Sequence, residues 1–173
     1  MHETLFVIDL ETTGLYPERG DRILEIAAVP VVEGRIRMER AFDRLVNPRT
    51  SIPPEATRIN GITDDMVRDA PPIERVLPEF FAHVGECPLV AHNAAFDVGF
   101  LRHYADALGL MGFTNRIIDT IDMSKELFPG SRSHSLDALV RRLGIPTGGG
   151  KRHRSLEDAF LTAHCYISMR ATR

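Results

Sequence analysis

The stretch TLFVIDLE (4–11) is the part of the chain that most clearly indicates the fold. It is apolar apart from Thr4 and two acids, Asp9 and Glu11, which is typical of a buried strand. The next segment, DRILEIAAVPVVEGRIRMERAFDRLV (21–46), predicts two more strands joined by a Glu-Gly turn at 33–34. The amino-terminal part of the chain is therefore expected to form a hairpin-like pair of strands.

Downstream of this hairpin, short strands alternate with helices. Strands are expected over 87–92 and at the start of 116–122, and helices over 73–83, 94–110, 136–143 and 156–170. The candidate helix N-caps are Thr63, Asn93, Ser135 and Ser155. The proline-punctuated segment 51–63 predicts a loop, and Pro78 predicts an irregularity or break in its helix. A hairpin followed by strand–helix alternation favours an α/β domain with a mixed sheet.

Length and composition favour a single globular domain over residues 1–173. Hydrophobic residues make up 43% of the chain and charged residues 26%. There is no apolar run of about 18 residues, which argues against a membrane-spanning helix and a membrane partner. The acidic start lacks the pattern of a signal peptide. The two cysteines, Cys87 and Cys165, lack metal-type spacing. We therefore expect a protein of the reducing cytoplasm.

The charge of the chain is unevenly distributed. Residues 1–130 hold 13 basic and 21 acidic side chains, whereas residues 131–173 hold 8 basic and 3 acidic ones. An acidic protein is a poor passive binder of nucleic acid. If phosphates are the substrate, a divalent cation is the obvious means of neutralising carboxylates near them.

Asp9 and Glu11 lie two residues apart at the end of the first predicted strand. Because side chains alternate on a strand, both acids continue the apolar face formed by Leu5 and Val7. Two carboxylates so close repel each other unless a cation lies between them. Taken alone, the pair fits better with a fraying strand end at which both acids face water.

Asp97 begins a stripe that otherwise looks like the buried face of a helix. The series Asp97, Leu101, Tyr104 and Leu108 follows helical spacing. Burying an unpaired carboxylate costs several kcal/mol, which favours a functional role. The alternative is an acid in the first helical turn, where the helix dipole stabilises it. The two interpretations are compatible.

Asp158 and His153 are the remaining candidates for chemistry. Ser155 and Asp158 match a capping box, and on pattern alone capping is the better interpretation of Asp158. His153 follows a glycine-rich stretch, where a lone histidine is usually solvated. Beside a carboxylate cluster it would instead suit proton abstraction near neutral pH. Periodicity cannot show whether these residues converge.

Three motifs, taken in order, resemble those of the DEDD superfamily of exonucleases. VIDLETTGL (7–15) resembles the first motif and VAHNAAFDVGFL (90–101) the second. HRSLEDA (153–159) resembles the third in its histidine form, with four residues between the histidine and the aspartate. The likeness covers nearly the whole chain and is strongest to the proofreading (epsilon) subunits of bacterial DNA polymerase III and their stand-alone relatives.

The resemblance implies a ribonuclease H-like fold with a central mixed five-stranded sheet flanked by helices. It implies 3′→5′ exonuclease activity that releases nucleoside monophosphates, with DNA favoured over RNA and single-stranded or mispaired ends favoured over paired ones. It further implies two divalent cations, Mg²⁺ or Mn²⁺, and as partners a free 3′ end and possibly a DNA polymerase. Carried over by position, the metal carboxylates are Asp9, Glu11, Asp97 and Asp158, and His153 is the general base.

The same resemblance implies a pocket for the terminal nucleotide. Its expected lining residues are Thr12, Thr13, Gly14, Leu15, Ile62, Asn93 and Phe96. Hydroxyls and backbone N–H groups after the first strand would hold the nucleotide, Leu15 would wedge against its base, and Ile62 would pack on it.

Two other functions stay open at this point. One is an exoribonuclease of the RNase T or oligoribonuclease type, because contacts to the 2′-OH cannot be identified from sequence. The other is a non-catalytic nucleic-acid-binding domain, which would be expected to have lost at least one of the five site residues. All five are present in this chain.

Overall fold

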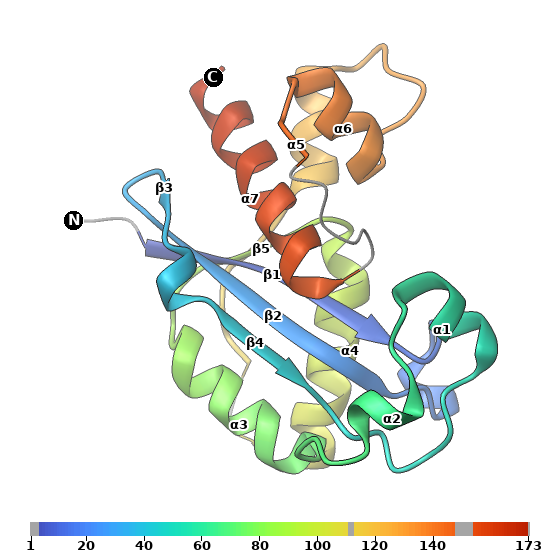
Figure 1. The fold of residues 1–173 in the computed structure, drawn as a ribbon. Coiled ribbons are helices and arrows are strands. Elements are labelled where there is room, and N and C mark those ends of the chain that lie inside the picture. The colour runs from blue at the N-terminus through green and yellow to red at the C-terminus, as the bar shows by residue number, and fades with distance from the viewer. Residues whose placement is uncertain (1–3, 111–112, 148–153, 173) are drawn as a thin grey trace.

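A computed structural model describes residues 4–110, 113–147 and 154–172 (Figure 1). The strands are β1 (Thr4–Thr12), β2 (Ile23–Val32), β3 (Arg35–Ile36), β4 (Phe42–Leu45), β5 (Leu89–Ala91) and β6 (Ile117–Asp119). The α-helices are α1 (Pro54–Asn60), α2 (Asp64–Val67), α3 (Ile73–Val84), α4 (Ala94–Ala107), α5 (Thr120–Leu127), α6 (Leu136–Leu143) and α7 (Ser155–Ala171). Two 3₁₀ turns, η1 (Pro17–Arg19) and η2 (Met38–Arg40), complete the described elements.

The strands form one mixed sheet in the order β3-β2-β1-β5-β6, with β4 also paired to β2. β2 is antiparallel to β1, β3 and β4, whereas β5 and β6 run parallel to β1. The sheet thus has six strands rather than the predicted five. The third predicted strand is split in two, because the η2 turn separates β3 from β4 along the same edge of β2.

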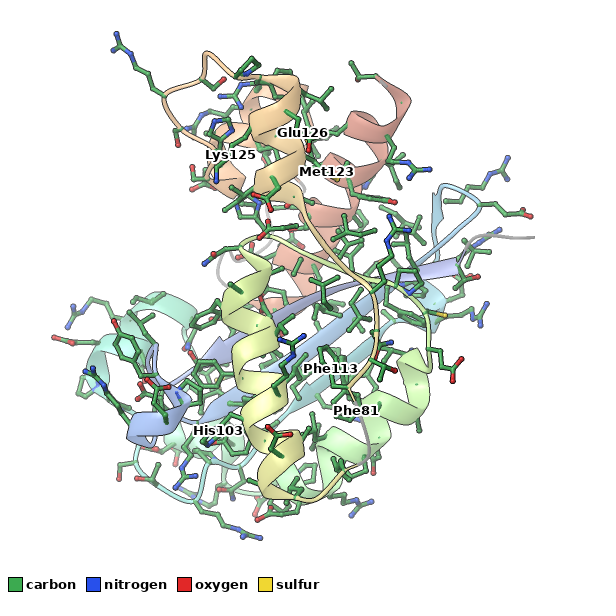
Figure 2. All side chains as sticks on the ribbon, turned by 180° about the vertical axis from the view of Figure 1, so that it is seen from behind. Phe81, His103, Phe113, Met123, Lys125 and Glu126 are labelled. Carbon is green, nitrogen blue, oxygen red and sulfur yellow. The ribbon has the colours of Figure 1, made fainter. Side chains whose placement is uncertain are left out.

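The alternation predicted for β1 is confirmed by packing on both faces of the sheet. Phe6, Ile8 and Leu10 face a core shared with α3 and α4. Leu5 and Val7 face a second core shared with α7. Figure 2 shows α4 crossing one face of the sheet, and Figure 1 shows α7 on the opposite face with α5 and α6 beside it. The end of β1 is therefore approached by a helix from each side.

An aromatic contact closes the first of these cores at its outer edge. Phe81, at the end of α3, and Phe113, in the segment that leads into β6, lie with ring centroids 5.6 Å apart (Figure 2). Aromatic pairs at this separation add about 0.5–1.5 kcal/mol beyond the area they bury. The contact ties α3 to the β6 side of the sheet.

Two of the four predicted N-caps are confirmed. The hydroxyls of Thr63 and Ser135 accept the N–H groups of Met66 and Ala138, at 3.4 and 3.3 Å. The cap predicted at Asn93 is wrong. Its backbone is left-handed, with φ 66°, and its side chain accepts no capping bond.

The Asp119 carboxylate takes over that role from β6. It accepts the N–H groups of Asn93 and Ala94, at 3.2 and 2.8 Å, at the start of α4. It also accepts the N–H of Ile121, at 2.8 Å, at the start of α5. One side chain therefore caps two helices, which a reading of local sequence around Asn93 cannot reveal.

The loop predicted over 51–63 and the break predicted at Pro78 are wrong. The segment 51–63, expected to be a loop, contains α1, which has prolines at its N-terminal end where their missing N–H is not needed. Pro78 does not break α3, which runs from Ile73 to Val84. The fully buried Val76, Leu77 and Phe80 hold this helix on the sheet.

In the part of the chain that the structure describes, no helix is long and apolar enough to span a membrane.

Candidate active site

Three of the predicted site carboxylates meet at the carboxyl end of β1. Asp9 and Glu11 come from the strand, and Asp158 comes from the first turn of α7. One oxygen from each carboxylate lies within 4.8 Å of the other two. Because the acids of β1 share a face with Leu5 and Val7, they point to the side that α7 covers. The pairing of strand end and helix start therefore builds the cluster.

Asp97 approaches the same strand from the opposite face. It lies in the first turn of α4, is only 3% exposed, and its Oδ1 accepts the N–H of Leu10 at 3.0 Å. It therefore lies against the backbone between Asp9 and Glu11, and its charge acts on Asp9. The prediction that the four acids converge is consistent with this placement, although Asp97 is not one of the three with oxygens within 4.8 Å.

The site strongly disfavours its own negative charge. Desolvation raises the pKa of Glu11 to about 8, and the charges of Asp158 and Glu25 act in the same direction. Desolvation likewise raises the pKa of Asp97 to about 8, against the effect of its backbone hydrogen bonds. The pKa of Asp9 is raised well above its ordinary value by desolvation and then by Asp97 and Glu11. These oxygen-only donors suit a hard divalent cation, which would stabilise their ionised forms.

A pH dependence of stability follows for the metal-free protein. Glu11 and Asp97 have raised pKa values when folded, so the folded state binds more protons than the unfolded chain from about pH 4.5 to about pH 8. The free energy of unfolding therefore falls as pH rises through this window. In EDTA we expect the melting temperature to drop by roughly 4 °C or more between about pH 6 and about pH 8.5.

Scanning calorimetry with and without Mn²⁺ checks this expectation. Saturating Mn²⁺ should remove most of the drop, because a bound cation favours the ionised acids. A melting temperature in EDTA that rises over the same interval would show that these acids do not destabilise the folded state.

Glu25 is a buried acid beside the cluster that the sequence analysis did not select. It lies opposite Glu11 in the β1–β2 register and is 1% exposed. Its carboxylate forms an ion pair with Arg154 and accepts the N–H of Ser155 at 2.9 Å. The cap predicted at Ser155 is therefore wrong, since α7 begins at Ser155 and its first N–H is bound by Glu25. An acid inside an otherwise apolar strand was the available signal.

Asn60 is a second residue near the cluster that was not predicted from the sequence. It is 4% exposed at the end of α1, and its amide nitrogen donates to the carbonyl of Thr12 at 3.4 Å. Its side chain also hydrogen-bonds to Glu11, which opposes the rise in the pKa of that carboxyl. The buried amide thus ties α1 to the end of β1. No local pattern marks this role, because the two residues are 49 positions apart.

The predicted general base, His153, lies outside the described residues. Arg154, the next residue in the chain, is held beside the cluster by Glu25. The role of His153 therefore stays a prediction.

Residues 6–166 match the family model described as Exonuclease (RNase_T). The chain belongs to this exonuclease family. The matched range includes every residue predicted above to bind metal or to act as the base.

Relatives within the exonuclease family include subunits of bacterial polymerases. A DNA polymerase III subunit epsilon-like protein of Rhodobacter capsulatus is 43% identical over 166 residues, which cover 96% of this chain and 23% of the relative. The DNA polymerase III subunit epsilon of Rickettsia typhi is 36% identical over 172 residues, which cover 96% of this chain and 74% of the relative. This chain thus spans less than a quarter of the first relative and about three quarters of the second.

Solved structures show the same fold. Exonuclease X in complex with 5′ overhanging duplex DNA has a TM-score of 0.78 at 36% identity, covering 97% of this chain and 92% of that chain. The nuclease domain of 3′hExo, a DEDDh family member bound to rAMP, has a TM-score of 0.84 at 22% identity, covering 99% and 93%. The ribonuclease H-like fold and the resemblance to DEDD exonucleases are confirmed. Membership of the exonuclease family indicates that the chain is a 3′→5′ exonuclease. The family uses divalent metals, with which the carboxylate cluster is compatible.

The segment after β1 is organised by Asp21, which limits what its side chains can offer a nucleotide. The Thr13 hydroxyl accepts the N–H of Arg22 at 2.8 Å and lies 3.4 Å from the Asp21 carboxylate. A Cβ on Gly14 would lie 2.4 Å from that carboxylate, so a glycine is needed there for close approach. The Thr12 hydroxyl donates to the Gly14 carbonyl at 2.6 Å. The hydroxyls of both threonines thus take part in shaping this exonuclease loop.

Three of the other predicted pocket residues remain available to a substrate, and one does not. Leu15 is 64% exposed, Asn93 is exposed, and Phe96 is half-buried with its ring against Phe100. Ile62 is fully buried in a small core with Leu24, Ile52, Ala56 and Val67. The prediction that Ile62 packs on the terminal base is therefore wrong in this structure, because no part of its side chain is accessible.

Proposed function

We propose that this chain is a metal-dependent 3′→5′ exonuclease that removes nucleoside monophosphates from the 3′ end of DNA. The observation that carries the proposal is the cluster of Asp9, Glu11 and Asp158 at the end of β1, in a chain of the exonuclease family. We also propose that residues 1–173 form one exonuclease domain, which is supported by two cores that pack on opposite faces of one sheet.

The residues proposed to hold two divalent cations, Mg²⁺ or Mn²⁺, are Asp9, Glu11, Asp97 and Asp158. Ions bound there would offset the charge of the carboxylates and stabilise the negative charge that builds up on a phosphodiester under attack. The side chains contribute a fixed arrangement of oxygen atoms on a strand and on two helix starts. Because these elements belong to the packed core, the oxygens are held before substrate arrives.

The protein would contribute acid–base chemistry and grip on the substrate through other residues. His153, in its neutral form, would accept a proton from the attacking water on an imidazole nitrogen. Leu15, Asn93 and Phe96 are the accessible residues proposed to contact the terminal nucleotide. Thr12, Thr13 and Gly14 would offer mainly backbone groups, because the hydroxyls of the threonines already have partners.

DNA is the proposed substrate because two of the similar proteins are associated with DNA by their names. The Rickettsia protein is named as a subunit of DNA polymerase III, and Exonuclease X was solved in complex with duplex DNA. A DNA polymerase is the protein partner that goes with this proposal. The cytoplasmic location stays a prediction from the sequence.

A degradation assay tests the direction and the substrate together. A 5′-labelled single-stranded DNA should shorten progressively in Mg²⁺ or Mn²⁺, and a 3′-phosphate should block attack. EDTA should stop release, and added metal should restore it. A mismatched primer-template should lose its mispaired end, and a short RNA of the same sequence should be degraded more slowly.

Several outcomes would contradict the proposal. Immediate release of the 5′ label as mononucleotide would show that degradation begins at the 5′ end and not at the 3′ end. Full activity in EDTA would contradict the proposed requirement for divalent metal ions. Faster degradation of the RNA would replace the DNA substrate with an RNA one.

A further inference from the structure

Glu25 is a buried carboxylate that the proposed chemistry does not use. It is the one charged residue of β2, which reads ILEIAAVPVV, and it lies in the core of the sheet with 1% exposure. Burying a carboxylate without partners is strongly unfavourable, so Glu25 needs hydrogen-bond partners in the core. Among the residues that the structure describes, its hydrogen bonds come from Arg154 and Ser155 at the start of α7.

Both oxygens of Glu25 are bound by this segment. The Arg154 Nε lies 3.1 and 3.0 Å from the two oxygens, and the Arg154 Nη2 also donates to Oε1. The N–H of Ser155 donates to Oε2 at 2.9 Å. Two guanidinium donors and one backbone donor fix the orientation of the Arg154 side chain as well as its distance from Glu25. The planar guanidinium can make both of its hydrogen bonds to a carboxylate in only a few orientations.

The same segment carries a proposed metal carboxylate. The N–H of Asp158 donates to the carbonyl of Arg154 at 3.0 Å, which closes the first turn of α7. Asp158 then reaches the oxygens of Asp9 and Glu11 within 4.8 Å. The start of α7 has no side-chain cap from its own N-cap residue, Arg154, so the fixing contact comes from β2.

We infer that Glu25 and Arg154 are positioning residues, which fix the start of α7 on the sheet and so place Asp158 against Asp9 and Glu11. Neither residue is proposed as a metal ligand, since both Glu25 oxygens are taken by Arg154 and Ser155. The inference rests on the proposed metal site. It adds that the affinity of this site for metal depends on an ion pair outside it.

The geometry also predicts that the two partners are not equivalent. Removing Arg154 leaves a buried negative charge on Glu25, directly across the strand pair from Glu11. Breaking a buried pair from one side is strongly destabilising, whereas replacing both partners is far less so. A double variant therefore separates the effect on stability from the effect on Asp158.

Titration of the protein with Mn²⁺ alone, followed by calorimetry, tests the inference without turnover. The variants are Glu25→Gln, Arg154→Met and the double variant, all compared with wild type. Glu79→Gln is the matched control, because it removes one carboxylate from an exposed ion pair with Arg75 on α3. NMR-detected amide exchange in metal-free protein reports on the N–H groups of Ser155 and Asp158.

We expect both single variants to bind Mn²⁺ about 10- to 100-fold more weakly, as for other residues that orient metal ligands. Exchange at Ser155 and Asp158 should quicken while β1 amides stay protected, and Glu79→Gln should match wild type. The double variant should melt at a higher temperature than Arg154→Met and still bind Mn²⁺ weakly. If Arg154→Met does not fold, Arg154→Lys keeps the charge without the two guanidinium donors and should show the same fall.

Two results would overturn the inference. Wild-type Mn²⁺ affinity and wild-type exchange in the single variants would show that α7 is held by its packing alone. Wild-type affinity in the double variant would show that the pair only balances charge. Failure of the wild-type protein itself to bind Mn²⁺ would instead count against the proposed metal site.

Discussion

Replacing Asp97 with asparagine should nearly abolish nucleotide release and leave the metal-free protein at least as stable as wild type. Loss of a residue that merely orients a metal ligand costs about 10- to 100-fold, so we expect a loss of at least about 100-fold for a proposed ligand. Stability should not fall, because an asparagine Oδ1 can still accept the N–H of Leu10, which Asp97 accepts at 3.0 Å.

The pH dependence of this variant gives a second check. Burial raises the pKa of Asp97 to about 8, so the wild-type fold loses stability progressively as pH rises from the ordinary range of a carboxyl group to about 8, and loses no more above it. The gain in melting temperature of Asp97→Asn in EDTA should therefore grow from about pH 6 to about pH 8 and then level off. Asp106→Asn, an exposed change on the same helix, should alter neither activity nor stability. A variant that unfolds, or that keeps near-wild-type turnover, would make Asp97 a structural residue.

Replacing His153 with alanine should slow single-turnover cleavage by about 10²–10⁴-fold, the usual contribution of a general base. The wild-type rate should rise with pH on the acid side, because only neutral imidazole can take a proton from water. The variant should lose most of this increase in rate with pH, although some increase should remain because the acids of the site also titrate. Mn²⁺ binding should be largely retained, since His153 is not proposed as a ligand.

The informative comparison measures both proteins across pH at saturating Mg²⁺. His103→Ala is the matched control, because His103 lies on α4 and packs edge-on against Tyr104 (Figure 2). It should keep the wild-type rate and pH profile. Equal rates and identical profiles for wild type and His153→Ala would remove His153 from the mechanism.

Much of the fold was predictable because buried positions recur at regular spacing in the sequence, and turns and helix ends favour particular residue types. The alternation of β1 predicted which residues face each core, and the Glu-Gly turn at 33–34 predicted the hairpin. Helix α6 begins and ends where predicted, with Ser135 as its cap. The split of the third predicted strand was not predictable, because both β3 and β4 pair with β2 and only the η2 turn between them interrupts the edge.

The acidic residues of the candidate site could be predicted from the sequence, but the residues that hold them in place could not. The motifs around Asp9, Asp97 and Asp158 identified the acids through their likeness to a family. The capping residues of the helices that carry Asp97 and Asp158 were predicted wrongly, because Asn93 and Ser155 have the residue types of N-caps. Asp119 and Glu25, from distant strands, bind the N–H groups instead.

The sequence by itself determined the alternating strand and the order of the elements, because these depend on neighbours within a few residues. Its motifs indicated the set of acids through their likeness to a family. The tertiary structure alone decided how those acids meet. Asp97 approaches β1 from one face and Asp158 from the other, and Glu25 binds a residue 129 positions away. It also placed Ile62 in the core, away from substrate. The physical reason is that burial and charge repulsion in this site act between segments far apart in the chain, so no local pattern records them.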